Sequence, residues 1–256
     1  MSEFSLLPET RCGFKVSEKR KKIWKVELDL IREFQRVCEK YNLRYFASNG
    51  TLLGIVRHHG FIPWDDDVDI VMPRPDYDKL LQVAGTEFSS PYILHTADTG
   101  HNYYRNYARL RNTATTAMPY RDWNRGDCCN GIFIDLFPLN GCAEPPVRWA
   151  GQKFLLRLLT AMANTYTYYP DFSGGKPMRK LLYQCAALFC HFQGYERLLE
   201  TIHEISCWEN YEEAAKVYEI THENKFFPFP ADYYKESLWM NFENIKLPVP
   251  KAYDAI

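Results

Sequence analysis

Apolar residues recur at three- and four-residue intervals in the first long regular segment of the chain. This segment extends from Ser17 to Asn42, and Lys and Glu residues lie between the apolar positions. The pattern predicts an amphipathic helix. A shorter helix is predicted over residues 51–57, and it is expected to end at Gly60, since glycine often follows the last helical residue. A third is predicted from Asp76, as its capping residue, through Ala84.

Short apolar runs bounded by turn residues predict the strands. These runs lie at residues 43–47, 68–72, 92–95, 107–111 and 132–139. After Val147 the pattern becomes helical again, with a long helix followed by helices over residues 178–192 and 195–208. Residues 239–249 then predict a late strand or an extended arm.

The order of these elements predicts an α/β (α+β) protein with a mixed sheet and flanking helices. Residues 1–145 are expected to form the catalytic core. Residues 146–256 are expected to form a mostly helical part whose late strand returns to that core.

Composition and charge exclude several classes of protein. The chain has 256 residues, 46% of them apolar, and 31 basic against 32 acidic residues. With a net charge of −1, the chain lacks the excess of positive charge that is typical of proteins that bind a nucleic acid polymer. No run approaches the roughly 20 apolar residues of a transmembrane helix, and residues 1–13 do not look like a signal peptide. A cytoplasmic protein without a transmembrane segment is therefore expected.

Eight cysteines are present, without a C-x-x-C motif. Most lie in apolar helical patterns, where a free thiol acts as a small apolar group. Cys128, Cys129 and Cys142 leave two interpretations open, a metal site or structural thiols.

Four aspartates occupy five positions, at Asp65, Asp66, Asp67 and Asp69. Asp67 and Asp69 are expected to share one face of a strand, with Val68 and Ile70 packed behind them, because alternate strand residues point the same way. Carboxylates this close repel one another unless a cation lies between them, and Mg²⁺ prefers such oxygen ligands. The alternative is an acidic turn neutralised by nearby basic side chains, namely Arg57, His58, His59 or Arg74.

Asp135 lies in the middle of the apolar run 132–137. A buried, unpaired carboxylate there would cost several kcal/mol, so it needs a cation. A metal shared with Asp67 and Asp69 would supply one. The alternative is a buried ion pair with Arg109 or Arg111.

A turn at residues 49–54 opens a short helix just before the acidic strand. Its glycines allow close approach of a ligand, and a helix N-terminus offers free N–H groups to phosphate. Arg57, Arg109 and Arg111 could neutralise a diphosphate, or make structural ion pairs. Trp64 could stack on a base or a quaternary ammonium group, or serve in packing.

Several motifs together resemble the LicD family. They are Gly50-Thr51-Leu52-Leu53-Gly54-Ile55-Val56-Arg57, Gly60-Phe61-Ile62-Pro63-Trp64-Asp65-Asp66-Asp67-Val68-Asp69-Ile70, Met72-Pro73-Arg74, Ala108-Arg109-Leu110-Arg111, Ile134-Asp135-Leu136-Phe137-Pro138-Leu139 and Phe242-Glu243. The resemblance covers residues 41–141 and returns near residues 239–254.

The resemblance implies a nucleotidyltransferase-like fold and a metal-dependent phosphotransferase. Bacterial members are associated with transfer of phosphocholine from CDP-choline to surface polysaccharide or teichoic acid precursors, and fukutin-related proteins use CDP-ribitol. It therefore implies Mg²⁺ or Mn²⁺, a CDP-activated alcohol donor with CDP-choline favoured, and a free or lipid-linked glycan acceptor. It also suits a cytoplasmic protein placed peripherally at the inner face of a membrane.

Carried onto this sequence, the resemblance makes Asp67, Asp69 and Asp135 the catalytic and metal-binding carboxylates. The expected substrate-binding residues are Asn49, Gly50, Thr51, Arg57, Trp64, Asp65, Asp66, Arg109, Arg111 and Glu243. Family members continue beyond the Tyr253–Asp254 region with a Tyr-Gly and Pro-rich tail that contains a His. This sequence stops at Ile256, which leaves three interpretations open: a truncated chain, weakened activity or an altered acceptor site.

Three rival functions remain open at this point. One is a nucleotidyltransferase that leaves the nucleotide on its product. Another is a glycosyltransferase with an Asp-x-Asp metal site. The third is a catalytically silent protein that binds a glycan or nucleotide.

Overall fold

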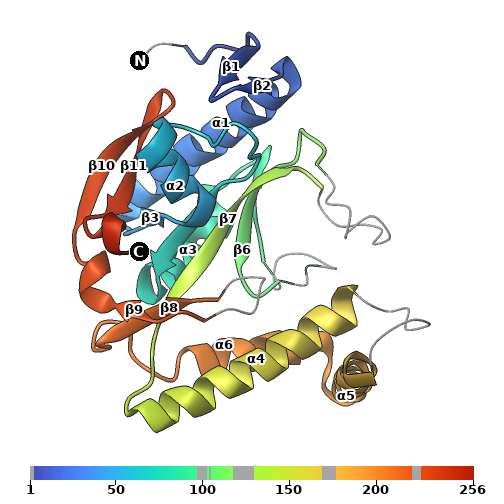
Figure 1. Ribbon diagram of the computed structural model, residues 1–256. Helices are drawn as coiled ribbons and strands as arrows, with labels where there is room; N and C mark the ends of the chain where they lie inside the picture. The colour runs from blue at the N-terminus through green and yellow to red at the C-terminus, as the bar shows by residue number, and fades with distance from the viewer. Residues whose placement is uncertain (1–2, 97–102, 104, 118–129, 169–176, 221–225) are drawn as a thin grey trace.

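The computed structural model describes residues 3–96, 103, 105–117, 130–168, 177–220 and 226–256 (Figure 1). The helices within these residues are α1 (Glu18–Tyr41), α2 (Asn49–His58), α3 (Arg74–Glu87), α4 (Pro146–Tyr168), α5 (Pro177–Gln193) and α6 (Tyr195–Ser206). The strands are β1 (Glu9–Arg11), β2 (Phe14–Val16), β3 (Phe46–Ala47), β4 (Asp69–Pro73), β5 (Tyr92–His95), β6 (Ala108–Asn112), β7 (Ile132–Gly141), β8 (Lys216–Glu219), β9 (Phe229–Pro230), β10 (Ser237–Phe242) and β11 (Ile245–Pro250).

A mixed sheet in the order β3-β4-β7-β6-β5 forms the centre of the molecule. Strands β4 and β7 are parallel, and the other neighbours in this order are antiparallel. The long strand β7 pairs with β6 along its first half and with β8 at its end, and β9 lies beside β8. The predicted α+β class, with a mixed sheet and flanking helices, is confirmed.

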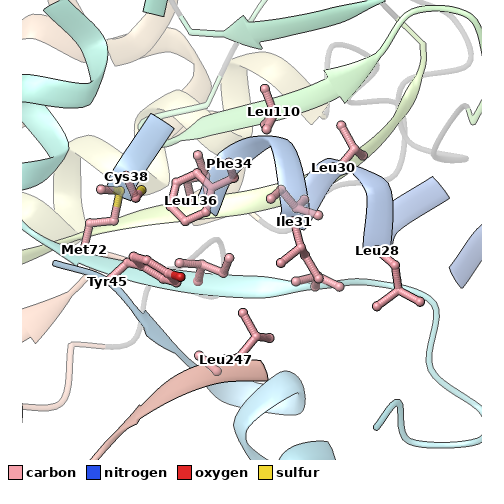
Figure 2. Packing of buried hydrophobic residues seen from close by; sticks show 14 of the residues in the cluster. Leu28, Leu30, Ile31, Phe34, Cys38, Tyr45, Met72, Leu110, Leu136 and Leu247 are labelled. Carbon is pink, nitrogen blue, oxygen red and sulfur yellow. The ribbon is translucent and has the colours of Figure 1, made fainter. Parts of the chain in front are cut away.

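Helix α1 provides the main apolar layer on one face of this sheet. It begins after Ser17, whose hydroxyl accepts a hydrogen bond from the Arg20 N–H at 3.3 Å, and it ends at Asn42 in the left-handed conformation. Figure 2 shows its apolar side chains beside Met72 of β4, Leu110 of β6 and Leu136 of β7. The helix predicted over this segment is thereby confirmed.

Strand alternation gives the two faces of the sheet different chemistry. Ile70 and Leu136 point into the core with α1, and both are fully buried. The residues one position before them, Asp69 and Asp135, therefore point to the opposite face. The core that holds β4 and β7 in register thus also fixes where these two carboxylates lie.

Helices α4, α5 and α6 pack around a second apolar cluster, at the end of the molecule far from the β1–β2 hairpin (Figure 1). Buried Gln152 of α4 links them to the chain beside β7. Its Oε1 accepts a hydrogen bond from the Ala143 N–H at 3.1 Å, and its Nε2 donates to the Ile205 carbonyl at 2.8 Å. The division of the chain at residue 145 stays a prediction.

The described helices include no segment with the length and hydropathy needed to span a membrane.

Two predicted helix boundaries were wrong. Helix α3 begins at Arg74, with Pro75 in its first turn, and Asp76 does not cap it. The Asp76 carboxylate instead accepts hydrogen bonds from the backbone N–H of Arg44 at 3.1 Å and from its Nε at 2.8 Å. The left-handed residue that ends α2 is His59, with φ of 53°, rather than Gly60.

The end of the chain forms a β10–β11 hairpin rather than one strand or arm. Leu247 and Val249 of β11 are buried in the same core as α1. Glu243 occupies the turn with φ of 51°, and its carboxylate accepts hydrogen bonds from the Arg11 guanidinium and from the Phe61 N–H at 3.1 Å. The turn thereby holds the β1–β2 hairpin and the segment after α2 together.

Candidate functional site

A pocket of about 770 Å³ opens on the polar face of the sheet, within the usual range of small-molecule sites. Helix α2, strands β4, β7 and β8 and the last residues of the chain form its walls. The lining residues are Ser48, Asn49, Leu52, Leu53, Val56, Arg57, Asp67, Asp69, Asp135, Phe137, Glu219, Phe227, Phe229, Tyr234, Tyr253, Asp254 and Ile256.

Asp69 and Asp135 lie side by side in this pocket. They are direct partners in the register of the parallel strands β4 and β7, and the Asp135 N–H donates to the Val68 carbonyl at 2.8 Å. Neighbouring strands are about 4.8 Å apart, so the two carboxylates emerge close together. Asp67, two residues before Asp69, lines the same pocket. The sequence placed these three residues in one site, and the structure brings them to one cavity.

The cation that faces Asp135 is Arg109, its register partner on β6. Arg109 Nε donates to Asp135 Oδ1 at 2.5 Å and Nη2 donates to Oδ2 at 3.1 Å. Both side chains are buried, at 5% and 8% exposure. Burial by itself would lower the pKa of Arg109, but the Asp135 carboxylate raises it above its ordinary value. The buried ion pair, one of the two alternatives for Asp135, is therefore present.

Burial raises the pKa of three further carboxylates of the pocket, those of Asp67, Asp69 and Glu219. Loss of solvent in the pocket, with the neighbouring Asp65 carboxylate, raises the pKa of Asp67 to about 7. Burial, followed by repulsion from Asp67 and Asp135, raises the pKa of Asp69 well above its usual range. Burial also raises the pKa of Glu219. This concentration of negative charge favours a cation in the pocket.

The donor set suits a divalent cation that is shared with a substrate. In the part of the chain that the structure describes, no group of three or more His, Cys, Asp or Glu side chains is arranged to hold a metal by itself. Mg²⁺, however, is commonly bound by one or two carboxylates together with substrate phosphates. Asp67 and Asp69 offer two such carboxylates, whereas both oxygens of Asp135 accept from Arg109.

The N-terminal end of α2 contributes Ser48 and Asn49 to the pocket lining. Asn49 adopts the left-handed conformation, with φ of 46°, which is uncommon for a residue other than glycine. The Ser48 hydroxyl donates to Glu219 at 3.1 Å. Arg57 at the other end of α2 also lines the pocket and is exposed. This part of the lining offers helix-terminal N–H groups and a cationic side chain to an anion.

Two other residues of the predicted phosphate turn do not line the pocket. Thr51 is buried, and its hydroxyl accepts a hydrogen bond from the Asp69 N–H at 2.8 Å. Gly50 faces Asp65, because a Cβ at this position would lie 2.8 Å from Asp65 Oδ2. Both residues position the acidic segment against α2.

The first half of the acidic segment lies on α1 rather than in the pocket. The Asp65 carbonyl accepts hydrogen bonds from Arg20 Nη1 at 2.7 Å and from Trp24 Nε1 at 3.0 Å. Asp66 is exposed, and its N–H donates to Asp65 Oδ1 at 3.2 Å. Trp64 is also exposed, with its ring edge-on to that of Phe14.

Three further predicted substrate-binding residues are also absent from the pocket lining. Arg109 is held by Asp135, as described above. Arg111 is buried, and its Nη1 donates to the Gly131 carbonyl at 2.9 Å. Glu243 lies in the β10–β11 turn, where it accepts from Arg11.

The sequence prediction missed the second half of the pocket. Glu219 lies on β8, which is a four-residue strand too short to give a clear alternating pattern. The aromatic residues Phe227, Phe229, Tyr234 and Tyr253 lie in segments with little regular structure. The sequence around Glu219 offered one signal of its place in a site: a single carboxylate that follows the apolar pair Val217 and Tyr218.

Of the three cysteines considered for a metal site, only Cys142 lies among the described residues. This thiol is free and buried, and burial raises its pKa to about 12. Cys128 and Cys129 lie outside the described residues.

The part of the chain that contributes α2, Asp67, Asp69 and Asp135 to this site matches a known family. Residues 42–143 match the family described as LicD/FKTN/FKRP, nucleotidyltransferase domain. The resemblance to the LicD family is confirmed. The matched region contains α2, β4, β6 and β7. It therefore includes Asp67, Asp69, Arg109 and Asp135.

Individual relatives agree with this match. The chain is 41% identical over 120 residues to the lipopolysaccharide cholinephosphotransferase LicD of Haemophilus influenzae, which covers 46% of this chain and 43% of that protein. It is 41% identical over 54 residues to the ribitol 5-phosphate transferase FKRP of Homo sapiens and of Mus musculus, covering 21% of this chain and 11% of those proteins. The chain therefore spans less than half of these relatives.

Proposed function

We propose that this protein transfers a phospho-alcohol unit from a CDP-activated donor to a sugar hydroxyl of a glycan. Phosphocholine is the favoured unit, because the 120-residue match at 41% identity is to a lipopolysaccharide cholinephosphotransferase. Transfer of ribitol phosphate is the second candidate, suggested by the shorter match to FKRP.

One observation supports this proposal most directly. Asp69 and Asp135 are register partners on parallel strands, and with Asp67 they line a pocket that also contains the N-terminal end of α2. Carboxylates close to the N-terminal end of a helix suit a diphosphate with its divalent cation. A cavity of about 770 Å³ is also large enough for a nucleotide-activated donor.

Different residues of the pocket would bind the diphosphate and the remainder of the donor. Asp67 and Asp69 would hold Mg²⁺ or Mn²⁺, which supplies neutralisation of the diphosphate charge when bound. The α2 N-terminus and Arg57 would hold the phosphate oxygens. The aromatic side chains of Phe227, Phe229 and Tyr234 give the pocket a surface for the remainder of the donor.

Transfer requires one bond to form at phosphorus and one to break. The acceptor oxygen attacks the phosphorus that carries the alcohol, the bond from that phosphorus to the bridging oxygen breaks, and CMP leaves with that oxygen. The hydroxyl proton passes to a carboxylate of the pocket, for which Asp135 and Glu219 are candidates. Arg109 holds Asp135 in a fixed orientation during this step.

The acceptor in this proposal is a surface polysaccharide or teichoic acid precursor, free or lipid-linked. The reaction would then take place in the cytoplasm at the inner face of a membrane. Nothing in the proposal requires a nucleic acid polymer.

The experiment that tests this function measures CMP release from CDP-choline and from CDP-ribitol with Mg²⁺ and a glycan acceptor. The double variant D67N/D69N should lower turnover by about 100-fold or more, since two of the proposed metal ligands become neutral. D232N, which changes an exposed aspartate outside the pocket, is the matched control and should keep wild-type turnover.

The products distinguish the proposal from its rivals. Pyrophosphate release would indicate nucleotidyl transfer, and release of a nucleoside diphosphate would indicate a glycosyltransferase. Binding of CDP-choline without metal-dependent turnover would indicate a silent binding protein. Wild-type turnover in D67N/D69N would show that the metal-binding assignment is wrong.

A further inference from the structure

Helices α4 and α5 each expose a stripe of apolar side chains. On α5 the stripe consists of Met178, Leu181, Cys185, Leu188 and Phe192, at intervals of three and four residues. Met178, Leu188 and Phe192 are 67%, 62% and 71% exposed. On α4 the stripe consists of Val147, Gly151, Phe154 and Leu158, with Phe154 65% exposed.

These stripes are additional to the faces that hold the helices in the protein. Leu156 of α4 and Ala186 of α5 are fully buried in the cluster that α4, α5 and α6 share. An ordinary surface helix would turn polar residues outward opposite such a face. On α4 the outward side is apolar too, and on α5 the apolar stripe lies between the buried face and the exposed polar residues Lys180, Gln184 and His191. Exposed apolar patches of this kind mark interaction surfaces.

The charges on the same two helices have one sign. Helix α4 has 23 residues and α5 has 17, and together they contain five Lys or Arg residues and no Asp or Glu. The whole chain has nearly equal numbers of both signs, and neighbouring α6 contains three glutamates. Positive charge is therefore concentrated on the helices that carry the exposed stripes. Lys153 and Arg157 on α4 and Lys180 on α5 are at least partly exposed.

We propose that the stripes of α4 and α5 form the surface by which this protein docks on an anionic phospholipid bilayer. Large apolar side chains interspersed with Lys and Arg are the pattern of helices that lie in the membrane interface. The excess of basic residues without any acidic ones complements anionic headgroups, and each such residue near the surface adds attraction. In Figure 1 these helices lie at one end of the molecule, away from the β1–β2 hairpin.

This surface extends the proposed location of the reaction by assigning the residues that contact the membrane. It does not depend on which unit is transferred, because the exposed fractions and the charges are independent of the pocket. A binding measurement without donor or acceptor therefore tests it separately from the enzymatic proposal.

The test is flotation of the full chain with vesicles of pure phosphatidylcholine and with vesicles containing about one-third phosphatidylglycerol. We expect the protein to float with the anionic vesicles at least about tenfold more than with the neutral ones, and less as salt is raised. The variant L188E/F192E should lose at least about tenfold of this binding, and K153E/K180E should lose most of the preference for phosphatidylglycerol.

The control is L7E, because Leu7 is 75% exposed but lies near the N-terminus, outside the two helices. It should bind as the wild type does. Unchanged circular dichroism and melting temperature establish that each variant is folded, and F154E on α4 provides an independent test if L188E/F192E does not fold. Absence of binding to anionic vesicles, or wild-type binding by folded L188E/F192E or F154E, would overturn the proposal. A dimer in size-exclusion chromatography that L188E/F192E converts to a monomer would instead assign the stripe to a second copy of the chain.

Discussion

The Arg109–Asp135 ion pair gives the sharpest prediction about stability. Replacing Arg109 with Met removes the guanidinium and leaves Asp135 as a buried carboxylate without its partner. The Met side chain can replace part of the Arg109 stem and would pack against Phe133, whose ring centroid lies 3.6 Å from the guanidinium carbon. The main effect should therefore be electrostatic.

The size of the effect follows from the burial of the pair. Both side chains are less than 10% exposed and are joined by two hydrogen bonds. Removing one partner of a buried pair costs about 3–5 kcal/mol, because the other charge remains desolvated. The double variant R109M/D135L removes both charges and should cost much less than the sum of the single variants, since an apolar pair of similar volume is often nearly neutral.

Urea unfolding of the wild type, R109M, D135L and R109M/D135L measures this coupling free energy. The experiment is done in EDTA, so that a divalent cation cannot replace Arg109 beside Asp135. A coupling free energy of about 2 kcal/mol or more is expected. A loss below about 1 kcal/mol in R109M, or additive losses in the double variant, would refute the view that Arg109 is the main counter-ion of Asp135.

Two further predictions concern the packing and the pH dependence of the fold. In Gly60→Ala the new Cβ would lie 2.2 Å from Glu243 Oε1, so the variant should lose about 1–3 kcal/mol in urea unfolding. Gly85→Ala, with nothing within 4 Å in helix α3, should instead gain about 0.5–1 kcal/mol, and equal effects of the two changes would contradict this packing. Burial, with two nearby arginines, lowers the pKa of His95 from 6.5 to about 4. The unfolded chain then binds the proton first, so stability should fall by about 2 kcal/mol as the pH is lowered from 7.5 to 5. His95→Phe should remove this part of the pH dependence, and an unchanged slope in urea unfolding at both pH values would show that another group is responsible.

The sequence by itself determined helix α1, the central strands β4 and β7, and the acidic chemistry of the pocket. The spacing of apolar residues in α1 and the apolar runs around Asp69 and Asp135 were strong local signals, because each reflects one buried face. The same runs showed that these carboxylates need a cation.

Only the tertiary structure decided which cation faces Asp135 and what completes the pocket. The choice of Arg109 over Arg111 depends on the register of β6 against β7, which brings Arg109 opposite Asp135 and Arg111 opposite Phe133. Glu219 and the aromatic wall reach the site through pairing of the short strand β8 with the end of β7. Pairing between segments about 80 residues apart depends on loop closure and packing, and short strands leave no periodic pattern in the sequence. Local patterns thus determined which residues are buried or charged, and long-range pairing determined which of them meet.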